Sequence, residues 1–258
     1  NKIIQEKLTE IDLLKDQLSQ LRPLNEQQIK NLKIYFDMQL TYNSNAIEGS
    51  TLDLSETKII LLQGITIGGK SMREHLEAIN HKYAIDYIED IVKRGDKEIK
   101  LVDILGLHRI ILREIDDENA GKYRKYDVYV MQKNSQKYIF PEPKLVPLLM
   151  ENFDLWMKEN VSLHPVILAC ESHYRFVTIH PFIDGNGRCA RLLMNLVLMQ
   201  NGYSSCIVKN EQRKEYLDSI EAAQNKGNMD PFYVLMIDSL KESLEIYIKT
   251  IKDNIIWK

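Results

Sequence analysis

Apolar residues recur at spacings of three and four along most of this chain of 258 residues, and this period places side chains on one face of an α-helix. The clearest case spans residues 3 to 21, where Pro23 follows and is expected to end the helix. We predict that this helix packs on its own domain; a coiled-coil or dimer contact is the alternative. Its apolar stripe consists of Ile4, Leu8, Ile11, Leu14, Leu18 and Leu21.

The same period predicts a series of further helices with recognisable end signals. Ser71 and Glu74 form a capping box at the start of one of them. One face of that helix consists of Leu76, Ile79, Tyr83 and Tyr87. The predicted ranges are 25–47, 55–62, 71–95, 101–113, 145–158, 163–178, 188–200, 211–224 and a last helix from 230 onward.

The pattern changes between residues 127 and 140, where Val128, Val130, Tyr138 and Phe140 alternate with mostly polar neighbours. Such alternation is typical of a β-strand, and the polar residues 133–136 between the two runs supply a turn. This segment is the one clear strand signal in the chain. We therefore predict an all-α helical bundle with one inserted β-hairpin.

Composition and charge fit an ordinary globular protein. Hydrophobic residues make up 44% of the chain and charged residues 28%, which is normal for a soluble domain. The formal net charge of −3 gives no electrostatic case for nucleic acid as the main partner, because polyanion binders usually show a basic excess. A basic pocket for a small phosphate compound remains compatible with this balance.

The cysteines Cys170, Cys189 and Cys206 are odd in number and lack a Cys-x-x-Cys spacing, so we expect neither a disulfide framework nor a structural zinc site. This favours a reducing, cytoplasmic location. No run of eighteen apolar residues and no charged-then-apolar leader occurs, so we expect no membrane span, no membrane partner and no signal peptide.

The segment from His180 to Arg191 carries the equipment of a phosphate site. Gly185, Asn186 and Gly187 lie just before a predicted helix, whose free N–H groups and positive dipole end favour an anion that glycines allow to approach closely. Arg188 and Arg191, three residues apart, can bracket a polyphosphate with planar donor pairs.

Two further residues of the segment suit chemistry on a phosphate. Asp184 offers oxygen to Mg²⁺, which commonly takes one or two carboxylates plus substrate phosphates. His180 is the residue best suited to accept a proton near neutral pH. Each feature alone has an ordinary structural explanation, but a purely structural turn needs no acid and two arginines converging on it.

The segment resembles the signature of Fic-domain proteins, His-x-Phe-x-(Asp/Glu)-Gly-Asn-Gly-Arg-x-x-Arg, and matches it at every specified position. The resemblance extends to Gly121-Lys-Tyr-Arg124, to the hairpin and to Pro141-Glu-Pro143, and more loosely to residues 216–224 and 231–232. It covers roughly residues 100 to 235, and it implies a Fic-type helical bundle.

The resemblance implies transfer of AMP from ATP to a protein hydroxyl, with Mg²⁺ as cofactor. His180 would deprotonate the target and Asp184 would hold the metal. The Gly185-Asn186-Gly187 backbone and the Asn186 side chain would cradle phosphates, Arg188 would also hold phosphate, and Arg191 would bind the γ-phosphate. Phe182 would anchor the loop in the core.

The resemblance also assigns roles outside the signature. The hairpin would be the flap that docks the target segment by strand-like pairing. Tyr216 and Gln224 lie where the family often lines the adenine pocket, although core and surface positions explain them equally well. The flap residues that we expect to meet the target are Val128, Tyr129, Val130, Tyr138 and Ile139.

A second motif spans Ser44 to Gly49. Ser44 and Glu48 share a helix face, and Glu48 lies in a last helical turn, where the dipole disfavours a carboxylate without a cation partner; Gly49 suits a left-handed helix stop. The motif resembles the inhibitory Ser/Thr-x-x-x-Glu-Gly/Asn of the family. This implies that Glu48 pairs with Arg191 and blocks the γ-phosphate position.

We therefore divide the chain into an N-terminal region with the inhibitory motif (1–98), a catalytic core with the flap (99–227) and a C-terminal helix packed on that core (228–258). The expected function is an autoinhibited protein adenylyltransferase that modifies a protein of unknown identity, or itself. Removal of AMP with Glu48 positioning water, transfer of UMP or phosphocholine, and a catalytically silent nucleotide-binding module are the alternatives. A homodimer through helical surfaces is expected by analogy.

Overall fold

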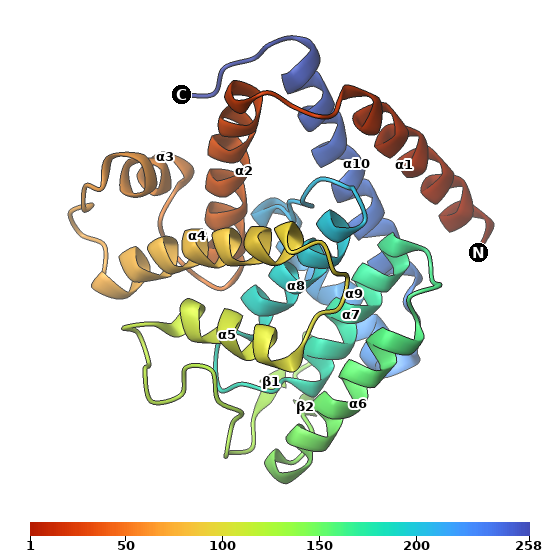
Figure 1. Ribbon diagram of the computed structural model, residues 1–258. Coiled ribbons are helices and arrows are strands. Elements are labelled where there is room, and N and C mark those ends of the chain that lie inside the picture. Colours follow the sequence, from red (N-terminus) through yellow and green to blue (C-terminus); the bar gives the residue numbers. More distant parts are fainter.

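The computed structural model describes all of residues 1–258 as a helical bundle with one short hairpin (Figure 1). The predicted all-α fold with an inserted hairpin is confirmed. The elements are α1 (Lys2–Leu21), α2 (Glu26–Ile47), α3 (Leu54–Lys58), α4 (Met72–Lys93), α5 (Leu101–Leu112), β1 (Tyr129–Met131), β2 (Lys137–Ile139), α6 (Val146–Glu159), α7 (Pro165–Ile179), α8 (Asn186–Gln200), α9 (Arg213–Lys226) and α10 (Asp230–Lys252).

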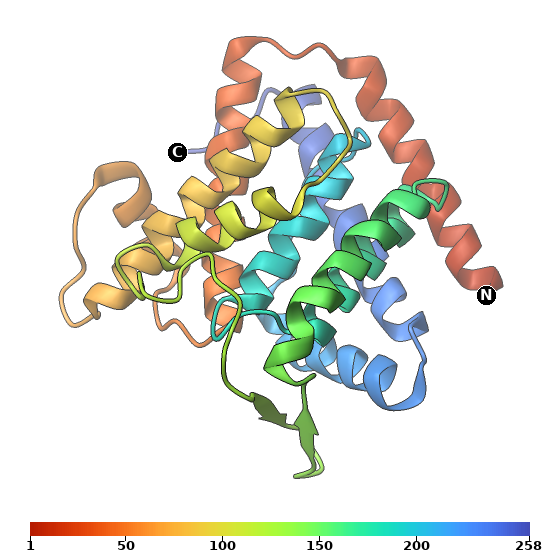
Figure 2. The ribbon, with the colours of Figure 1, turned by 60° about the horizontal axis from the view of Figure 1, so that its bottom comes forward.

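Helix α8 lies in the middle of the bundle, and α2, α4, α5 and α7 pack around it (Figures 1 and 2). Its sequence explains this position, because apolar residues cover most of its circumference and twelve of its fifteen residues are buried. One hydrophobic core of 49 buried residues extends from Ile4 to Ile251 and so includes all three predicted regions. The boundaries between these regions stay a prediction.

Helix α1 lies alongside α10 at the edge of the bundle (Figures 1 and 2). Ile4, Leu8, Ile11 and Leu18 of the predicted stripe are buried there, which confirms that the helix packs on its own domain. Salt bridges from Lys7 to Asp238 and from Lys241 to Glu10 lie beside this apolar seam.

Helix α4 begins at the predicted capping box, since the Ser71 side chain accepts from the Glu74 N–H and the Glu74 carboxylate accepts from the Ser71 N–H. The face read from the sequence is not the buried one, however: Ile79 and Tyr83 are exposed. Helix α4 instead buries polar residues that find partners. The face that it turns inward consists of His75, Ala78, Asn80, His81, Ala84, Ile85, Ile88 and Ile91.

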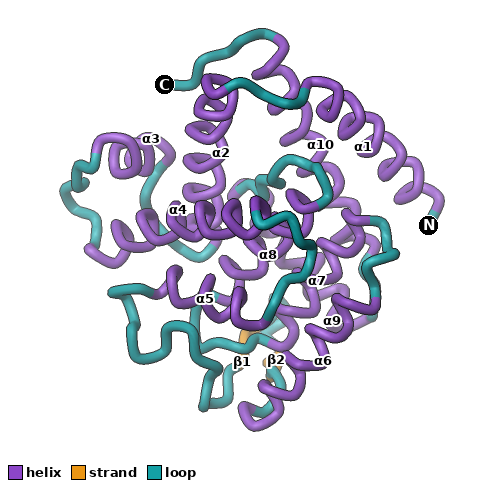
Figure 3. Tube along the Cα trace, in the orientation of Figure 1, coloured by secondary structure: helices purple, strands orange, loops and turns teal.

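The hairpin is the only strand structure in the molecule and projects from one end of the bundle (Figures 2 and 3). Its strands are antiparallel, with Val130 opposite Tyr138. A two-stranded ribbon is marginal by itself, and this one is anchored by Phe140, which is buried against the bundle. No helix of the protein combines the length and the apolar character that a membrane crossing requires.

Candidate functional site

The loop between α7 and α8 is shaped by two left-handed backbone positions. His180 ends α7 at φ 52° and Gly185 precedes α8 at φ 84°. Helix α8 begins at Asn186, two residues earlier than predicted. The Asn186 side chain accepts from the Phe182 N–H at 3.0 Å and donates to the Phe182 carbonyl at 2.8 Å. Both polar ends of this side chain therefore close the loop, and the expected direct role of the side chain in holding phosphate is not supported.

Phe182 holds this loop in the core, as predicted. Its ring is fully buried and stacks on His108 of α5, with ring centroids 3.6 Å apart. His108 accepts from the Gly121 N–H through Nδ1 at 2.9 Å, which leaves Nε2–H to donate to the Asp184 carbonyl at 2.8 Å. Burial lowers the pKa of His108 to about 4, so the ring stays neutral and keeps this tautomer at pH 7.

Arg124 ties the loop to the base of the hairpin. Its guanidinium donates to the carbonyls of His180 at 2.7 Å, Tyr126 at 3.0 Å and Pro141 at 2.6 Å, and its N–H donates to the Pro181 carbonyl at 2.9 Å. Only 3% of Arg124 is exposed. The planar fork of an arginine can serve several carbonyls at once, which a lysine cannot do in the same geometry.

His180 has the geometry of a neutral base. Its Nδ1 lies 3.3 Å from the Val177 carbonyl, which favours the tautomer that leaves the Nε2 lone pair free. The ring stacks on Phe140 at the end of the hairpin, with centroids 3.9 Å apart. Burial lowers the pKa of His180 to about 4, the contact with Val177 opposes that shift, and the nearby Arg124 adds to it.

Arg191 of α8 is held by the end of α2 and by α9. Its Nη2 donates to Glu48 Oε1 at 2.6 Å and to the Ser44 carbonyl at 3.0 Å, and its Nε donates to Ser44 Oγ at 2.9 Å. Its Nη1 donates to the Tyr216 hydroxyl at 3.1 Å. The side chain of Arg191 is 5% exposed and that of Glu48 39%, so the pair lies at the border between core and solvent.

Glu48 also lies directly on the N-terminus of α8. A Cβ atom at Gly187 would come within 2.2 Å of Glu48 Oε1, so only glycine leaves room for this carboxylate. Glu48 thus occupies the place where the free N–H groups of a helix start bind an anion. Gly49, at φ 101°, ends the helical backbone as predicted.

The end of α2 that carries Glu48 is held by the segment before and in α9. Arg213 Nε donates to the Ile47 carbonyl at 2.8 Å, and the Asn210 N–H donates to Asn43 Oδ1 at 2.9 Å. The first contact satisfies a carbonyl at the C-terminal end of a helix, which otherwise lacks an intrahelical partner. Both contacts place the Glu48 carboxylate against α8.

Tyr216 lies under the Arg191 guanidinium and is buried. Because Arg191 can only donate, the Tyr216 hydroxyl accepts from it and donates to His173 Nε2 at 2.7 Å. Burial lowers the pKa of His173 to about 3, and Arg191 adds to that shift. His173 is therefore a buried, hydrogen-bonded histidine.

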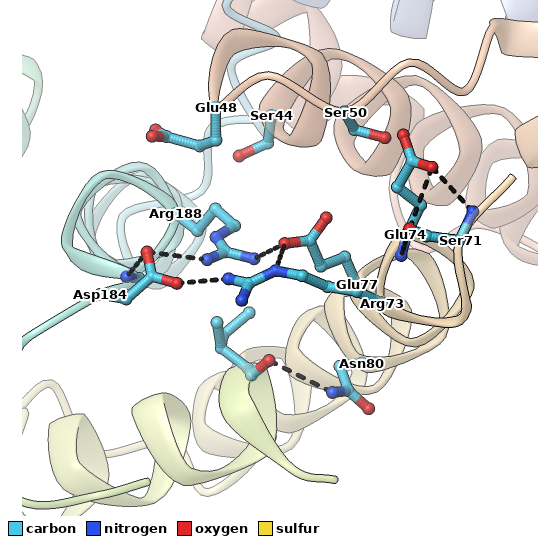
Figure 4. Close-up of polar contacts among 12 residues, drawn as sticks. Ser44, Glu48, Ser50, Ser71, Arg73, Glu74, Glu77, Asn80, Asp184 and Arg188 are labelled. Carbon is cyan, nitrogen blue, oxygen red and sulfur yellow. Dashed lines mark hydrogen bonds and ion pairs between the residues drawn. The ribbon is translucent and has the colours of Figure 1, made fainter. Parts of the chain in front are cut away.

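Asp184 lies between two arginines. Its Oδ2 accepts from Arg73 Nη2 at 2.7 Å, and its Oδ1 accepts from Arg188 Nη2 at 3.3 Å (Figure 4). Both arginines also contact Glu77 Oε1, Arg73 at 3.1 Å and Arg188 at 3.4 Å. Burial would raise the pKa of Asp184, but Arg188, the Gly185 N–H and Arg73 outweigh it and hold that pKa below its usual range.

One cavity of about 600 Å³ brings seven of the seventeen predicted site residues together, and Asp184 and Gly185 are not among them. It lies between the hairpin, the α7–α8 loop and α9, and an adenine nucleotide is of suitable size for it. Arg188 and Asn186 do not line this cavity and are buried. The predicted residues in its wall are Glu48, Val130, His180, Gly187, Arg191, Tyr216 and Gln224.

The expected flap residues lie on two sides of the hairpin. Val130 faces the nucleotide-sized cavity, whereas Val128, Tyr129 and Ile139 line an open groove on the other side. Tyr138 is half-buried and packs edge-on against Phe140.

Sequence reasoning missed several residues of the site. Arg73 and Glu77 come from α4, about a hundred positions before the loop, and Ser71-Met-Arg-Glu74 was interpreted only as a helix start. Arg124 belongs to a stretch that carried the family resemblance but had no assigned role. The available signal was its place in Gly121-Lys-Tyr-Arg124, a stretch that matches the family next to the predicted hairpin.

Comparisons with known proteins agree with this geometry. The model of the Fic/DOC family matches residues 98–198. Protein adenylyltransferase Fic of Drosophila grimshawi is 36% identical over 250 residues, which cover 96% of this chain and 50% of that protein. The Drosophila melanogaster protein of the same name is 37% identical, with 96% and 49% covered. The chain thus spans about half the length of these curated relatives.

Two solved structures are similar over nearly the whole chain. A Fic domain containing signaling protein from Bacteroides thetaiotaomicron gives a TM-score of 0.89 at 29% identity, with 96% of this chain and 98% of that one covered. Fic-1 from C. elegans gives a TM-score of 0.85 at 31% identity, with 98% and 74% covered. The similarity therefore includes the N-terminal helices as well as the segment that the family model matches.

Proposed function

The chain belongs to the Fic/DOC family, and on that premise we propose that it is a protein adenylyltransferase that moves AMP from ATP to a hydroxyl side chain of another protein or of itself. One observation carries this proposal. A neutral histidine, His180, and the anion-binding start of α8 with Arg191 share the wall of one nucleotide-sized cavity.

The residues of the cavity suit an in-line displacement at the α-phosphate. His180 Nε2 takes the proton of the target hydroxyl, whose oxygen forms a bond to the α-phosphorus. The bond from that phosphorus to the oxygen leading to the β-phosphate breaks, and pyrophosphate leaves. Positioning and charge stabilisation by the start of α8 and by Arg191 supply most of the rate enhancement in such a reaction.

Asp184 fits a magnesium ion. Its side chain is 46% exposed, and Mg²⁺ commonly binds through one or two carboxylates together with substrate phosphates and water. No cluster of three or more acidic, histidine or cysteine side chains exists that would bind a metal without substrate. A bound Mg²⁺ would neutralise phosphate charge, and Asp184 would hold it next to the start of α8.

The hairpin suits docking of an extended target segment. Phe140 N donates to the Val128 carbonyl, so in the alternating pattern of an antiparallel pair the backbone groups of Tyr129 and Met131 point away from the partner strand. Both residues are exposed. A target strand can pair with this edge and present its hydroxyl toward His180.

We further propose that the resting enzyme is autoinhibited. The Glu48 carboxylate pairs with the Arg191 guanidinium and fills the space beside Gly187. The end of the triphosphate would bind to that guanidinium and in that space. A homodimer and a cytoplasmic location stay predictions; the three cysteines are free, buried thiols, as a reducing compartment favours.

A second candidate reaction is the removal of AMP from a modified protein. Glu48 and His180 line the same cavity, so the carboxylate is in a position to orient a water molecule. Incubation of an AMP-modified protein with this chain and Mg²⁺, followed by measurement of free AMP, separates this reaction from transfer.

The proposed reaction has a labelling signature. With Mg²⁺ present, ATP labelled at the α-phosphate should label protein, whereas ATP labelled at the γ-phosphate should not, because only AMP is transferred. Mass spectrometry should show a mass gain of one AMP on the modified protein. Label from the γ-phosphate would instead identify a kinase. If the Glu48→Gly variant also incorporates no label, the proposal is contradicted.

The rate of transfer should stay constant with pH across the range in which an ordinary histidine titrates. The pKa of His180 is about 4 because of burial, so the base form predominates above that pH and is lost only as the pH falls through about 4. The acid limb of kcat/KM, which reports the free enzyme, should accordingly lie well below 6.5. A limb at about 6.5 would show that His180 titrates like an exposed imidazole.

A further inference from the structure

Arg73 forms an ion pair with Asp184, the carboxylate that would bind Mg²⁺ in the proposed reaction. Arg73 Nη2 is 2.7 Å from Asp184 Oδ2, and Arg73 Nε is 3.1 Å from Glu77 Oε1 (Figure 4). The guanidinium thus bridges two carboxylates from different parts of the chain. The same negative charge of Asp184 and Glu77 would attract a divalent cation to the place of this guanidinium.

Arg188 bridges the same two carboxylates from the other side, at 3.4 Å from Glu77 Oε1 and 3.3 Å from Asp184 Oδ1. Two arginines and two carboxylates therefore form a closed ring with no net charge. The two arginines differ in their surroundings: the Arg188 side chain is 3% exposed, whereas that of Arg73 is 55% exposed. Arg188 is a fixed part of the site, and Arg73 is free to move away.

We propose that Arg73 competes with Mg²⁺ for Asp184 and thereby sets the magnesium concentration at which the enzyme binds ATP. Without nucleotide, the guanidinium neutralises Asp184 and orients it. When Mg²⁺ and ATP enter, Arg73 leaves Asp184 Oδ2 and keeps its contact with Glu77. This inference rests on the proposed function, because it assigns Asp184 to the metal.

The competition acts at a different place from the contact of Glu48. Glu48 pairs with Arg191 and touches the start of α8, so it opposes the triphosphate chain. Arg73 approaches Asp184 from α4 and opposes only the metal. Both contacts come from the N-terminal region, whose helices pack on α8, so one movement of that region would weaken them together.

The test measures binding rather than activity. In a Glu48→Gly background, calorimetric titrations with a non-hydrolysable ATP analogue at increasing Mg²⁺ give the magnesium concentration for half-maximal affinity. Arg73→Gln should lower that concentration about two- to fivefold, the range that exposed ion pairs reach. In EDTA the same variant should bind the analogue equally well or more weakly, because a positive charge near the phosphates has been removed.

Lys93→Gln is the matched control, since it removes one exposed cation from the far end of α4 and should leave the magnesium dependence unchanged. The inference is wrong if Arg73→Gln has the magnesium dependence of its parent, or if it changes affinity equally with Mg²⁺ and in EDTA. In either case transfer from α-labelled ATP would still support the proposed function. Failure of the Glu48→Gly parent to bind Mg²⁺ and the analogue would contradict both proposals.

Discussion

Glu48→Gly is expected to raise the initial rate of AMP transfer by about ten- to a hundredfold. The carboxylate now takes a charge-assisted hydrogen bond of 2.6 Å from Arg191. Without it, that guanidinium and the space at Gly187 become available to the end of the triphosphate. Hydrogen bonds to charged groups contribute about 1.5–3 kcal/mol, which corresponds to this range of rates.

The rate is measured with α-labelled ATP and Mg²⁺ on the wild type and the variant side by side. Glu48→Gln is the matched comparison, because it keeps the size of the side chain and removes the charge; an intermediate rate is expected. Arg191→Ala in the Glu48→Gly background should lose most of the gain. Equal labelling of the wild type and of Glu48→Gly would contradict the proposed autoinhibition.

The same variant should also change in stability. Arg191 is buried, and the removal of Glu48 leaves it with Ser44 and Tyr216 as neutral partners. Loss of one member of a buried ion pair is usually destabilising, so the midpoint of thermal unfolding should fall without ligand. ATP with Mg²⁺ should raise the midpoint of the variant more than that of the wild type, because a ligand stabilises the state that it binds.

Local patterns were sufficient for most of the fold. The period of α1, the capping box at Ser71 and the alternation that produced the hairpin each depend on residues close in sequence. The signature loop was equally accessible, since its glycines, its acid and its histidine lie within twelve positions. The position of Glu48 in a last helical turn alone fits a solvated carboxylate equally well; the resemblance of Ser44 to Gly49 to the family's inhibitory motif is what predicted its pairing with Arg191, which the structure contains.

Contacts between distant segments were not predictable in this way. The buried face of α4 carries His75, Asn80 and His81, which apolar periodicity assigns to the surface. Asn80, for example, donates to the carbonyls of Ile111 and Arg113 at the C-terminal end of α5. Arg73 meets Asp184 over 111 positions of sequence. The expectation for Asn186 failed for a different reason. The loop was expected to present its side chain to phosphate, but both polar ends of that side chain bond to the backbone of Phe182 within the loop.

Removal of His180, the proposed general base, is expected to change the rate of AMP transfer at least as strongly as removal of Glu48. His180→Ala in the Glu48→Gly background should lower the rate of transfer by about 10²- to 10⁴-fold, the usual contribution of a general base. Affinity for Mg²⁺ and the ATP analogue should change little, because no anion-binding group is removed.

The matched control is His164→Ala at the opposite end of α7, where the imidazole contacts Asp12 and takes no part in the cavity. Its rate should stay within about twofold, since surface substitutions far from a site have small effects. Transfer by His180→Ala at the parental rate, with binding intact, would exclude His180 as the base and leave the start of α8 and Arg191 as the main source of catalysis.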